Sequence, residues 1–140
     1  MKPPETYDFC IEVTVRERDL DELDHVNNTV YLQYAESVAR AHADALGLGM
    51  EKMNSLGGSF VVRRHEITYH LPANLGDMLT VATRLGRMGG VRAERFTGIF
   101  RGPSLIAEAN TEWVWIALET RRAARFPVYV RNVMSTSATP

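Results

Sequence analysis

The sequence predicts an α+β fold in which an antiparallel sheet of about five strands packs against one principal helix. Two observations carry this prediction. A long segment near the N-terminus repeats apolar residues at helical spacing, and a succession of long segments rich in β-branched and aromatic residues follows it. Turn signals that contain Gly or Pro separate those segments, as in neighbouring strands joined in a meander.

The first two elements are a strand and the principal helix. Residues 9–15 alternate apolar and polar side chains, as a half-buried strand does. The helix is expected over 29–46, with Asn27 or Asn28 as its N-cap and Gly47 as its stop. Its apolar residues recur three or four positions apart: Val30, Tyr34, Val38, Ala41 and Ala45.

The rest of the chain is expected to form strands. After a loop or short helix over 47–58, these strands are expected over 59–71, 78–88, 91–101 and 104–118. A turn over 119–125 then precedes a last extended piece, 126–130. Several of these strands exceed the usual length of about five or six residues. Strands of this length can curl round a single helix, and a second subunit could cover the far face of the sheet.

Length and composition exclude several classes of protein. The 140 residues suit one domain, 1–140, with loose ends at about 1–6 and 134–140. A formal net charge of -1 shows no bias toward nucleic acid or anionic membrane, and no apolar run is long enough for a membrane span. The N-terminus lacks the apolar core of a signal peptide, and a single cysteine, Cys10, excludes an intramolecular disulfide. We therefore expect a cytoplasmic protein.

Residues 21–31, which read DELDHVNNTVY, concentrate polar side chains just before the helix. The N–H groups of a helix N-terminus are unsatisfied, and with the helix dipole they favour negative charge. Asp19, Asp24 and Asn27 can therefore serve simply as caps. The same N–H groups can also stabilise the oxyanion formed when a carbonyl is attacked, while a nearby carboxylate holds a water or attacks directly. A thioester suits such a site, because its carbonyl is electrophilic and its thiolate leaves readily.

The motif resembles the 4-hydroxybenzoyl-CoA thioesterase-like branch of the hotdog-fold superfamily. The resemblance is carried by Asp19-Leu-Asp-x-x-x-His-Val-Asn-Asn-x-x-Tyr31, followed by Tyr34 and Glu36 on the helix. It continues in Ile67-Thr-Tyr-His-Leu-Pro-Ala-Asn-Leu-Gly-Asp77 and in Thr111-Glu-Trp-Val-Trp-Ile116, and it covers roughly residues 9 to 128.

This resemblance implies a hotdog fold, in which a curved antiparallel β-sheet wraps a long central helix. It also implies homodimers or homotetramers with active sites between subunits, which hydrolyse acyl-CoA or acyl-carrier-protein thioesters without a metal or other cofactor. Asp21 stands at the position of the catalytic aspartate, a nucleophile or general base. The backbone N–H of Asn28 would polarise the carbonyl. Plant acyl-carrier-protein thioesterases have an asparagine at the position of Leu23 and a glutamate near the position of Pro72. These two departures from their pattern favour CoA thioesters.

Other candidate residues near the motif each have two interpretations. His25 could position substrate, orient Asp21 or carry a proton near neutral pH, or it could bond to backbone and lock the loop. Asn27 and Tyr31 could contact substrate, although capping and core packing are their default roles. Ser59 begins a strand where relatives place residues that approach the acyl group from the partner subunit, or it is a plain junction between loop and strand.

The charged residues of the strands give weaker predictions. Arginines expected on strands and at hairpin tips could bind the phosphates of CoA, or they could face solvent: Arg63, Arg64, Arg87 and Arg92. Glu36 is expected to pair with Arg40, four residues further along the helix. His65 and Glu66 should point to opposite faces of their strand, and no arrangement of residues predicts a metal site.

Alternative functions remain open at this point. The same fold could be an acyl-carrier-protein thioesterase, or a module that binds acyl-CoA without hydrolysing it. A hotdog dehydratase or hydratase would use a histidine with a second acid on a different sequence pattern, and an enoyl-CoA hydration assay without thiol release would identify it. The sequence leaves the acyl group itself open, from short-chain to medium-chain and aromatic.

Overall fold

The computed structural model describes residues 3–4 and 6–137 of the chain, and its elements follow the predicted order. The strands are β1 (Phe9–Thr14), β2 (Gly58–Tyr69), β3 (Met78–Gly89), β4 (Arg92–Arg101) and β5 (Ser104–Ala117). The helices are the short 3-10 helix η1 (Glu17–Asp19), α1 (Asn28–Ala45), α2 (Met50–Ser55) and α3 (Val128–Ser137).

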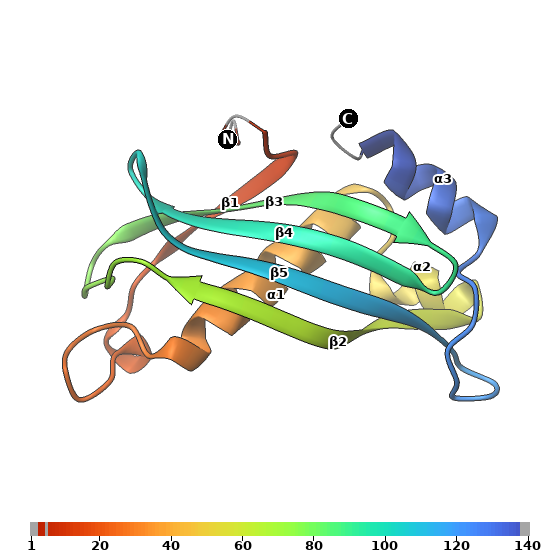
Figure 1. The fold of residues 1–140 in the computed structure, drawn as a ribbon, viewed down its shortest axis with the longest axis horizontal. Coiled ribbons are helices and arrows are strands. Elements are labelled where there is room, and N and C mark those ends of the chain that lie inside the picture. Colours follow the sequence, from red (N-terminus) through yellow and green to blue (C-terminus); the bar gives the residue numbers. More distant parts are fainter. Residues whose placement is uncertain (1–2, 5, 138–140) are drawn as a thin grey trace.

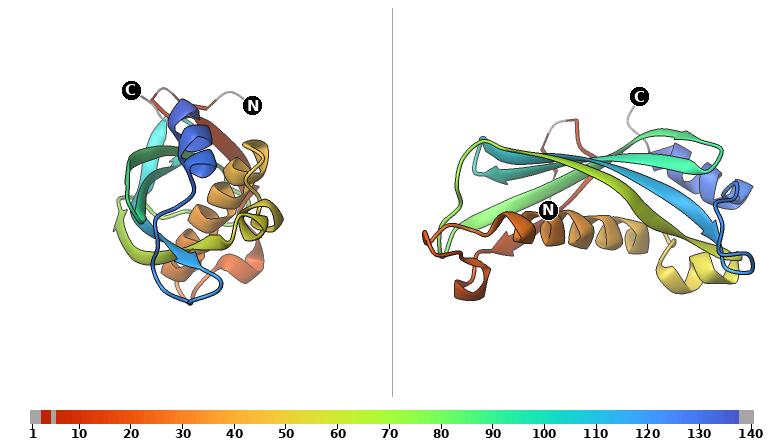
Figure 2. Two further views of the ribbon diagram at one scale, coloured as in Figure 1. Left: turned by 90° about the vertical axis from the view of Figure 1, so that its right-hand side faces the viewer. Right: turned by 60° about the horizontal axis from the view of Figure 1, so that its bottom comes forward.

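All five strands belong to one antiparallel sheet in the order β1-β3-β4-β5-β2. Helix α1 lies across one face of this sheet, and the sheet is open and twisted over the helix (Figures 1 and 2). Helix α1 packs most closely against β1 and β3, so it covers that half of the face more closely than the half formed by β5 and β2. The predicted α+β hotdog arrangement is therefore confirmed, and β1 and β2 form the edges of the sheet.

Helix α1 forms where the periodicity predicted it, within one residue at each end. Asn27 is the N-cap, because its side chain accepts a hydrogen bond from the N–H of Thr29. Val30, Tyr34 and Val38 are buried as expected, whereas Ala45 is exposed. The buried stripe turns instead toward Tyr31, Ala35, Ala39 and His42.

The extended segment predicted over 126–130 is wrong, because the chain forms helix α3 there. Val130 and Met134 are spaced four residues apart in α3 and are both buried, as on one helix face, and Phe126 is buried just before the helix begins at Val128. The β-branched valines of this segment concealed that spacing. Helix α3 also takes in residues 134–137 of the predicted loose tail, while 138–140 lie outside the described residues.

The core consists of two apolar clusters separated by a row of polar side chains on the inner face of the sheet. One cluster, with Val81 and Ile99, packs under the start of α1. The other, with Leu85, Ala93 and Trp115, packs against α2 and α3. Between them lies a set that we call the inner polar row, in which His65, Thr83, Arg95 and Thr111 belong to the sheet and His42 to the facing helix α1.

Hydrogen bonds connect the members of the inner polar row. The Arg95 Nη1–H group donates to His42 Nδ1 and to Thr83 Oγ1, each at 3.0 Å. His65 Nδ1 lies 2.9 Å from Thr111 Oγ1 on the neighbouring strand. Burial and the adjacent Arg95 lower the pKa of His42 to about 4, while Asp8 opposes this shift. His42 is therefore neutral at neutral pH, and its Nδ1 accepts a hydrogen bond from the Arg95 guanidinium.

This pKa predicts a loss of stability in acid. The folded-state pKa of His42, about 4, lies below its ordinary value of 6.5, so the stability linked to neutral His42 is complete above pH 6.5 and falls as the pH drops toward 4. The free energy of unfolding should decrease by up to about 3 kcal/mol across that range. Denaturant titrations at stepped pH should show a shallower pH slope in His42→Gln than in wild type. His70 is exposed, so His70→Gln serves as the control and should keep the wild-type slope. A wild-type slope in His42→Gln would contradict the prediction.

Candidate active site

The loop between η1 and α1 closes on itself and thereby places Asp21 just ahead of the helix. Leu20 and Val26 form an antiparallel bridge, and the N–H of Asn27 donates to the carbonyl of Asp19 at 2.8 Å. The N–H of Val26 donates to the carbonyl of Ala73, which ties the loop to the turn after β2. The loop is therefore held at both ends by backbone hydrogen bonds.

Asp21 is half-buried at the base of this loop, and only one of its two carboxylate oxygens is engaged. Oδ1 accepts hydrogen bonds from the N–H groups of Leu23, at 2.9 Å, and His25, at 3.3 Å. Oδ2 makes no hydrogen bond to any described residue. The first oxygen fixes the orientation of the carboxylate, and the second is left to bind a water or to attack an electrophile.

The start of α1 offers one unoccupied backbone donor. Asn27 Oδ1 accepts from both the N–H and the hydroxyl of Thr29, at 3.0 and 2.9 Å, and the N–H of Val30 donates to the carbonyl of Asn27. The N–H of Asn28 has no acceptor in the described part of the chain, and Asn28 is exposed. Asn27 thus acts as the cap, while Asn28 presents an N–H at the positive end of the helix dipole.

The structure also places the other residues of the motif. The backbone of His25 locks the loop through Asp21, and its half-buried imidazole makes no hydrogen bond within the described residues. Tyr31 is 3% exposed and packs edge-on against Tyr34 and Tyr69, so it belongs to the core. Asp19 has a structural role, because its Oδ2 accepts from the N–H of Arg16 and from the hydroxyl of Tyr34.

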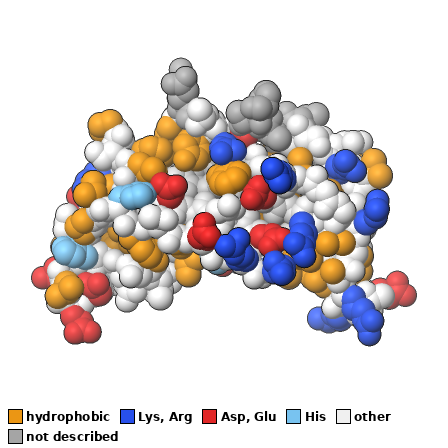
Figure 3. Space-filling view, viewed as in Figure 1, with side chains coloured by type: hydrophobic (Ala, Val, Ile, Leu, Met, Phe, Trp, Pro, Cys, Tyr) orange, Lys and Arg blue, Asp and Glu red, His pale blue; other side chains and the backbone are white. Residues whose placement is uncertain are grey.

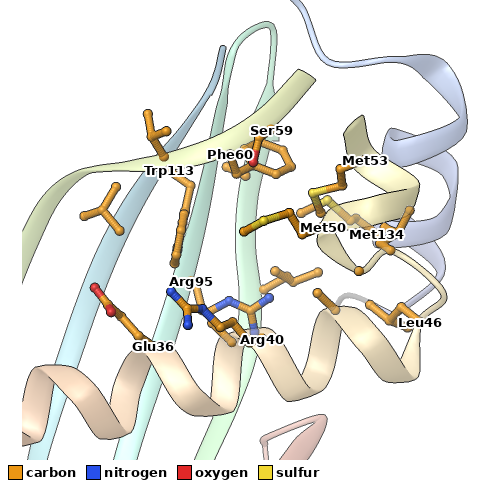
Figure 4. A pocket seen from close by; sticks show the side chains of 18 of the residues that line it. Glu36, Arg40, Leu46, Met50, Met53, Ser59, Phe60, Arg95, Trp113 and Met134 are labelled. Carbon is orange, nitrogen blue, oxygen red and sulfur yellow. The ribbon is translucent and has the colours of Figure 1, made fainter. Parts of the chain in front are cut away.

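A separate cavity of about 580 Å³ lies between α1 and the β2 side of the sheet (Figure 4). Ser59 and Phe60 of β2 line it, as do Glu36 and Arg40 of α1 and Trp113 of β5. Apolar side chains from the second core cluster close its far end: Leu48, Met53, Leu85, Ala93 and Met134. The volume is in the range of small-molecule sites, which is about 300–1,000 Å³.

Sequence reasoning did not identify Arg95 as a residue of this cavity. Arg95 reaches into it from β4 (Figure 4), although alternation along β4 could have placed this residue between Ala93 and Thr97 on the inner face. The predicted pairing of Glu36 with Arg40 is wrong. Glu36 Oε1 instead lies 4.0 Å from His65 Nε2 on β2, because the side chain turns toward the sheet.

The motif and the cavity are separate within one chain. Glu36 is the first residue of α1 that lines the cavity, and at 1.5 Å per residue it lies about 12 Å along the helix from Asn28. Strand β2 spans both places. Its Ser59 end lines the cavity, while the hydroxyl of Tyr69 at its other end donates to the carbonyl of Asn28 at 3.1 Å.

The candidate arginines gather on the outer face of the sheet, which Figure 3 views directly. Arg63 and Arg92 both pair with Glu112, at 2.7 and 3.0 Å, and both are more than half exposed. Arg64 pairs with Glu66. Arg87 is also exposed, near the β3–β4 hairpin at the end of the sheet away from the Asp21 loop (Figure 1). No group of three or more His, Cys, Asp or Glu side chains suited to a metal occurs among the described residues.

Comparison with known proteins shows which family the chain resembles. The family described as the thioesterase-like superfamily matches residues 15–134. The long-chain acyl-CoA thioesterase FadM of Escherichia coli is 32% identical over 114 residues, which cover 80% of this chain and 86% of FadM. The acyl-acyl carrier protein thioesterase ATL2 of Arabidopsis thaliana is 30% identical over 87% of this chain, which spans 65% of the length of ATL2.

Solved structures show the same similarity. A thioesterase from Thermus thermophilus, complexed with coenzyme A and Zn, is 30% identical, with a TM-score of 0.85 over 98% of this chain and all of that one. The YbaW probable thioesterase from Escherichia coli is 28% identical, with a TM-score of 0.79 over 93% of this chain and 98% of that one. No helix in the described part of this chain is both long and apolar enough to cross a bilayer.

Proposed function

Because the chain belongs to the thioesterase-like superfamily, we propose that it hydrolyses an acyl-CoA thioester to the free acid and CoA. The observation that carries the proposal is the arrangement of Asp21 and Asn28. One oxygen of the Asp21 carboxylate is held by two backbone N–H groups and the other is available. An unoccupied helix N–H follows within the same closed loop.

In the proposed reaction, Asp21 takes a proton from a water molecule as the water oxygen attacks the thioester carbon. The carbonyl oxygen becomes an oxyanion and accepts a hydrogen bond from the Asn28 N–H, which lowers the barrier. When the intermediate collapses, the C–S bond breaks and the CoA thiolate leaves with the electron pair. The proton held by Asp21 then passes to this thiolate or to solvent water, which restores the Asp21 carboxylate. Direct attack by Asp21 would give an acyl-aspartyl anhydride that water then hydrolyses, and both routes use the same two groups.

We further propose that a homodimer completes the site. β2 is an edge strand of 12 residues, and its free edge can pair with another copy of itself. A two-fold antiparallel pairing would bring the Ser59 end of one β2 beside the Tyr69 end of its partner. Since Tyr69 contacts Asn28, this pairing would place the Asn28 helix start of one subunit near the cavity of the other. A tetramer could assemble from such dimers.

Cavity lining and the surface arginines support a CoA ester as substrate. An acyl group suits the apolar far end of the cavity, and the exposed Arg63 and Arg92 are available to the phosphates of CoA. FadM is named for long-chain acyl-CoA and ATL2 for acyl-carrier-protein substrates, so both carriers belong in the test. We also propose that the protein acts in the cytoplasm, as expected from the sequence.

The test is thiol release measured with a thiol-reactive chromophore. The panel should run from acetyl-CoA to palmitoyl-CoA and include benzoyl-CoA and phenylacetyl-CoA. The same acyl groups should also be presented on acyl carrier protein. Turnover of CoA esters is the expected result, and turnover on the carrier protein alone would move the proposal to that substrate class. Binding of acyl-CoA without thiol release on either carrier would reject hydrolysis.

A further inference from the structure

We propose that the cavity selects acyl groups that end in a carboxylate, and that Arg95 is the residue that recognises this carboxylate. The proposal rests on the proposed function in one respect, since these acyl groups would be presented as thioesters. It is carried by the burial of Arg95, by its place in the cavity wall and by the donors that its guanidinium leaves unused.

Arg95 is a buried cation that faces the cavity. It is only 7% exposed, on a strand whose neighbouring inner residues are Ala93 and Thr97. Its side chain lines the cavity, and Figure 4 shows it reaching from β4 toward α1. Burial lowers the pKa of Arg95 to about 10, partly offset by Asp8, so the guanidinium remains charged at neutral pH.

The guanidinium is only partly satisfied by the protein. Its Nη1 donates to His42 and Thr83, both uncharged at neutral pH. Its Nε and Nη2 groups make no hydrogen bond to the described residues, and none of the ion pairs found there involves Arg95. A guanidinium carries five N–H donors in a planar fork that matches a carboxylate. Several donors are therefore available to a ligand in the cavity.

A purely structural role accounts poorly for this residue. Burying a charge costs free energy unless it is paired, and an apolar side chain of similar volume commonly serves a core as well or better. His42 and Thr83 could be satisfied by smaller polar groups. Asp8 attracts Arg95 electrostatically but accepts none of the hydrogen bonds of its guanidinium, so a ligand carboxylate in the cavity would be the group that pairs directly with the remaining donors.

The rest of the cavity suits the methylene chain of such an acyl group. Leu85, Ala93 and Met53 give it an apolar surface. Two carboxylates also line it, but each is engaged elsewhere: Glu36 lies beside His65, and Glu94 accepts from the Arg87 N–H and the Asn110 side chain. A chain with an acidic end therefore fits a cavity that combines apolar walls with one buried cation.

The test compares matched thioesters that differ only at the far end of the acyl group. Adipoyl-, suberoyl- and sebacoyl-CoA are each set against hexanoyl-, octanoyl- and decanoyl-CoA, and kcat/KM is measured for wild type and Arg95→Leu. The control is Arg84→Leu, because Arg84 lies on the adjacent strand and stacks over Phe96 rather than lining the cavity. Binding of suberate and of 1-octanol, which carries no carboxylate, is measured by calorimetry on the same three proteins, which needs no turnover.

Wild type and Arg84→Leu should prefer the diacid ester at one chain length, and Arg95→Leu should lose roughly ten- to a hundredfold in kcat/KM for that ester alone. Suberate should bind more tightly than 1-octanol, and only Arg95→Leu should abolish the difference. Equal kcat/KM for both esters in wild type, or a preference that survives in Arg95→Leu, would overturn the inference. If no ester is hydrolysed but suberate binding depends on Arg95, the inference stands and the proposed function fails. If suberate binding does not depend on Arg95 either, both fail.

Discussion

Asp21→Asn should lower kcat for thioester hydrolysis by roughly 10²–10⁴-fold while the protein keeps its fold. Asparagine retains the Oδ1 acceptor that receives the Leu23 and His25 N–H groups, so the closed loop is preserved. It replaces the free Oδ2 with the NH2 group of an amide, which can neither take a proton from water nor attack the carbonyl. The measurement is thiol release on the best acyl-CoA of the panel, with KM recorded separately.

Asp24→Asn is the matched control for this substitution. Asp24 lies in the same loop and carries the same charge, but it is exposed, and its φ of 60° is one that asparagine tolerates. Its activity should stay close to that of wild type. Full activity in a folded Asp21→Asn would reject a catalytic role for the Asp21 carboxylate. An equal loss in both variants would show that the charge of the loop matters rather than this particular carboxylate.

Mixing two inactive variants should restore activity if the site is built between subunits. Asp21→Ala lacks the carboxylate, and Ser59→Trp blocks the cavity at the start of β2. In a mixed dimer, the intact Asp21 of one chain would face the intact cavity of the other. Random re-association makes half of the dimers mixed, with one working site in each, so activity should recover to about a quarter of the wild-type value.

The same mixture gives no recovery if each site lies within one chain, because every site then carries one defect. Co-expression with two different affinity tags isolates the mixed dimer, and thiol release is measured on the purified species. Circular dichroism and thermal unfolding of Ser59→Trp separate a blocked cavity from a damaged fold. Absence of activity in an isolated, folded mixed dimer would contradict the β2 pairing.

Local patterns were sufficient to predict most of the architecture. Period-two alternation along β1, helical spacing along α1 and Gly or Pro turns between the strands each depend on neighbouring residues, so they are legible in the sequence. Helix α3 was not predicted, because β-branched residues such as Val128 and Val130 favour strands locally. Its helical form comes from burying Val130 and Met134 within the second core cluster.

The motif itself could also be read from the sequence, because Asp21, His25 and Asn28 are neighbours in the chain. Their order predicted a capped helix with a carboxylate ahead of it. The structure added which oxygen of Asp21 is engaged, and that Asn27 is the cap while the Asn28 N–H is left open. The catalytic roles of these residues stay predictions until the variants above are measured.

The cavity, by contrast, was decided only by tertiary structure. Arg95 lies 53 positions from His42 in the chain and 12 from Thr83. The register of β3 and β4 brings Arg95 to Thr83, and the packing of α1 against the sheet brings His42 to both. The separation of α1 from β2 then makes the space that Arg95 faces. The helices and strands and their order follow from the local sequence pattern. The burial of a charge such as that of Arg95 depends on which distant segments pack around it. The spacing of residues along the sequence does not reveal those long-range contacts directly.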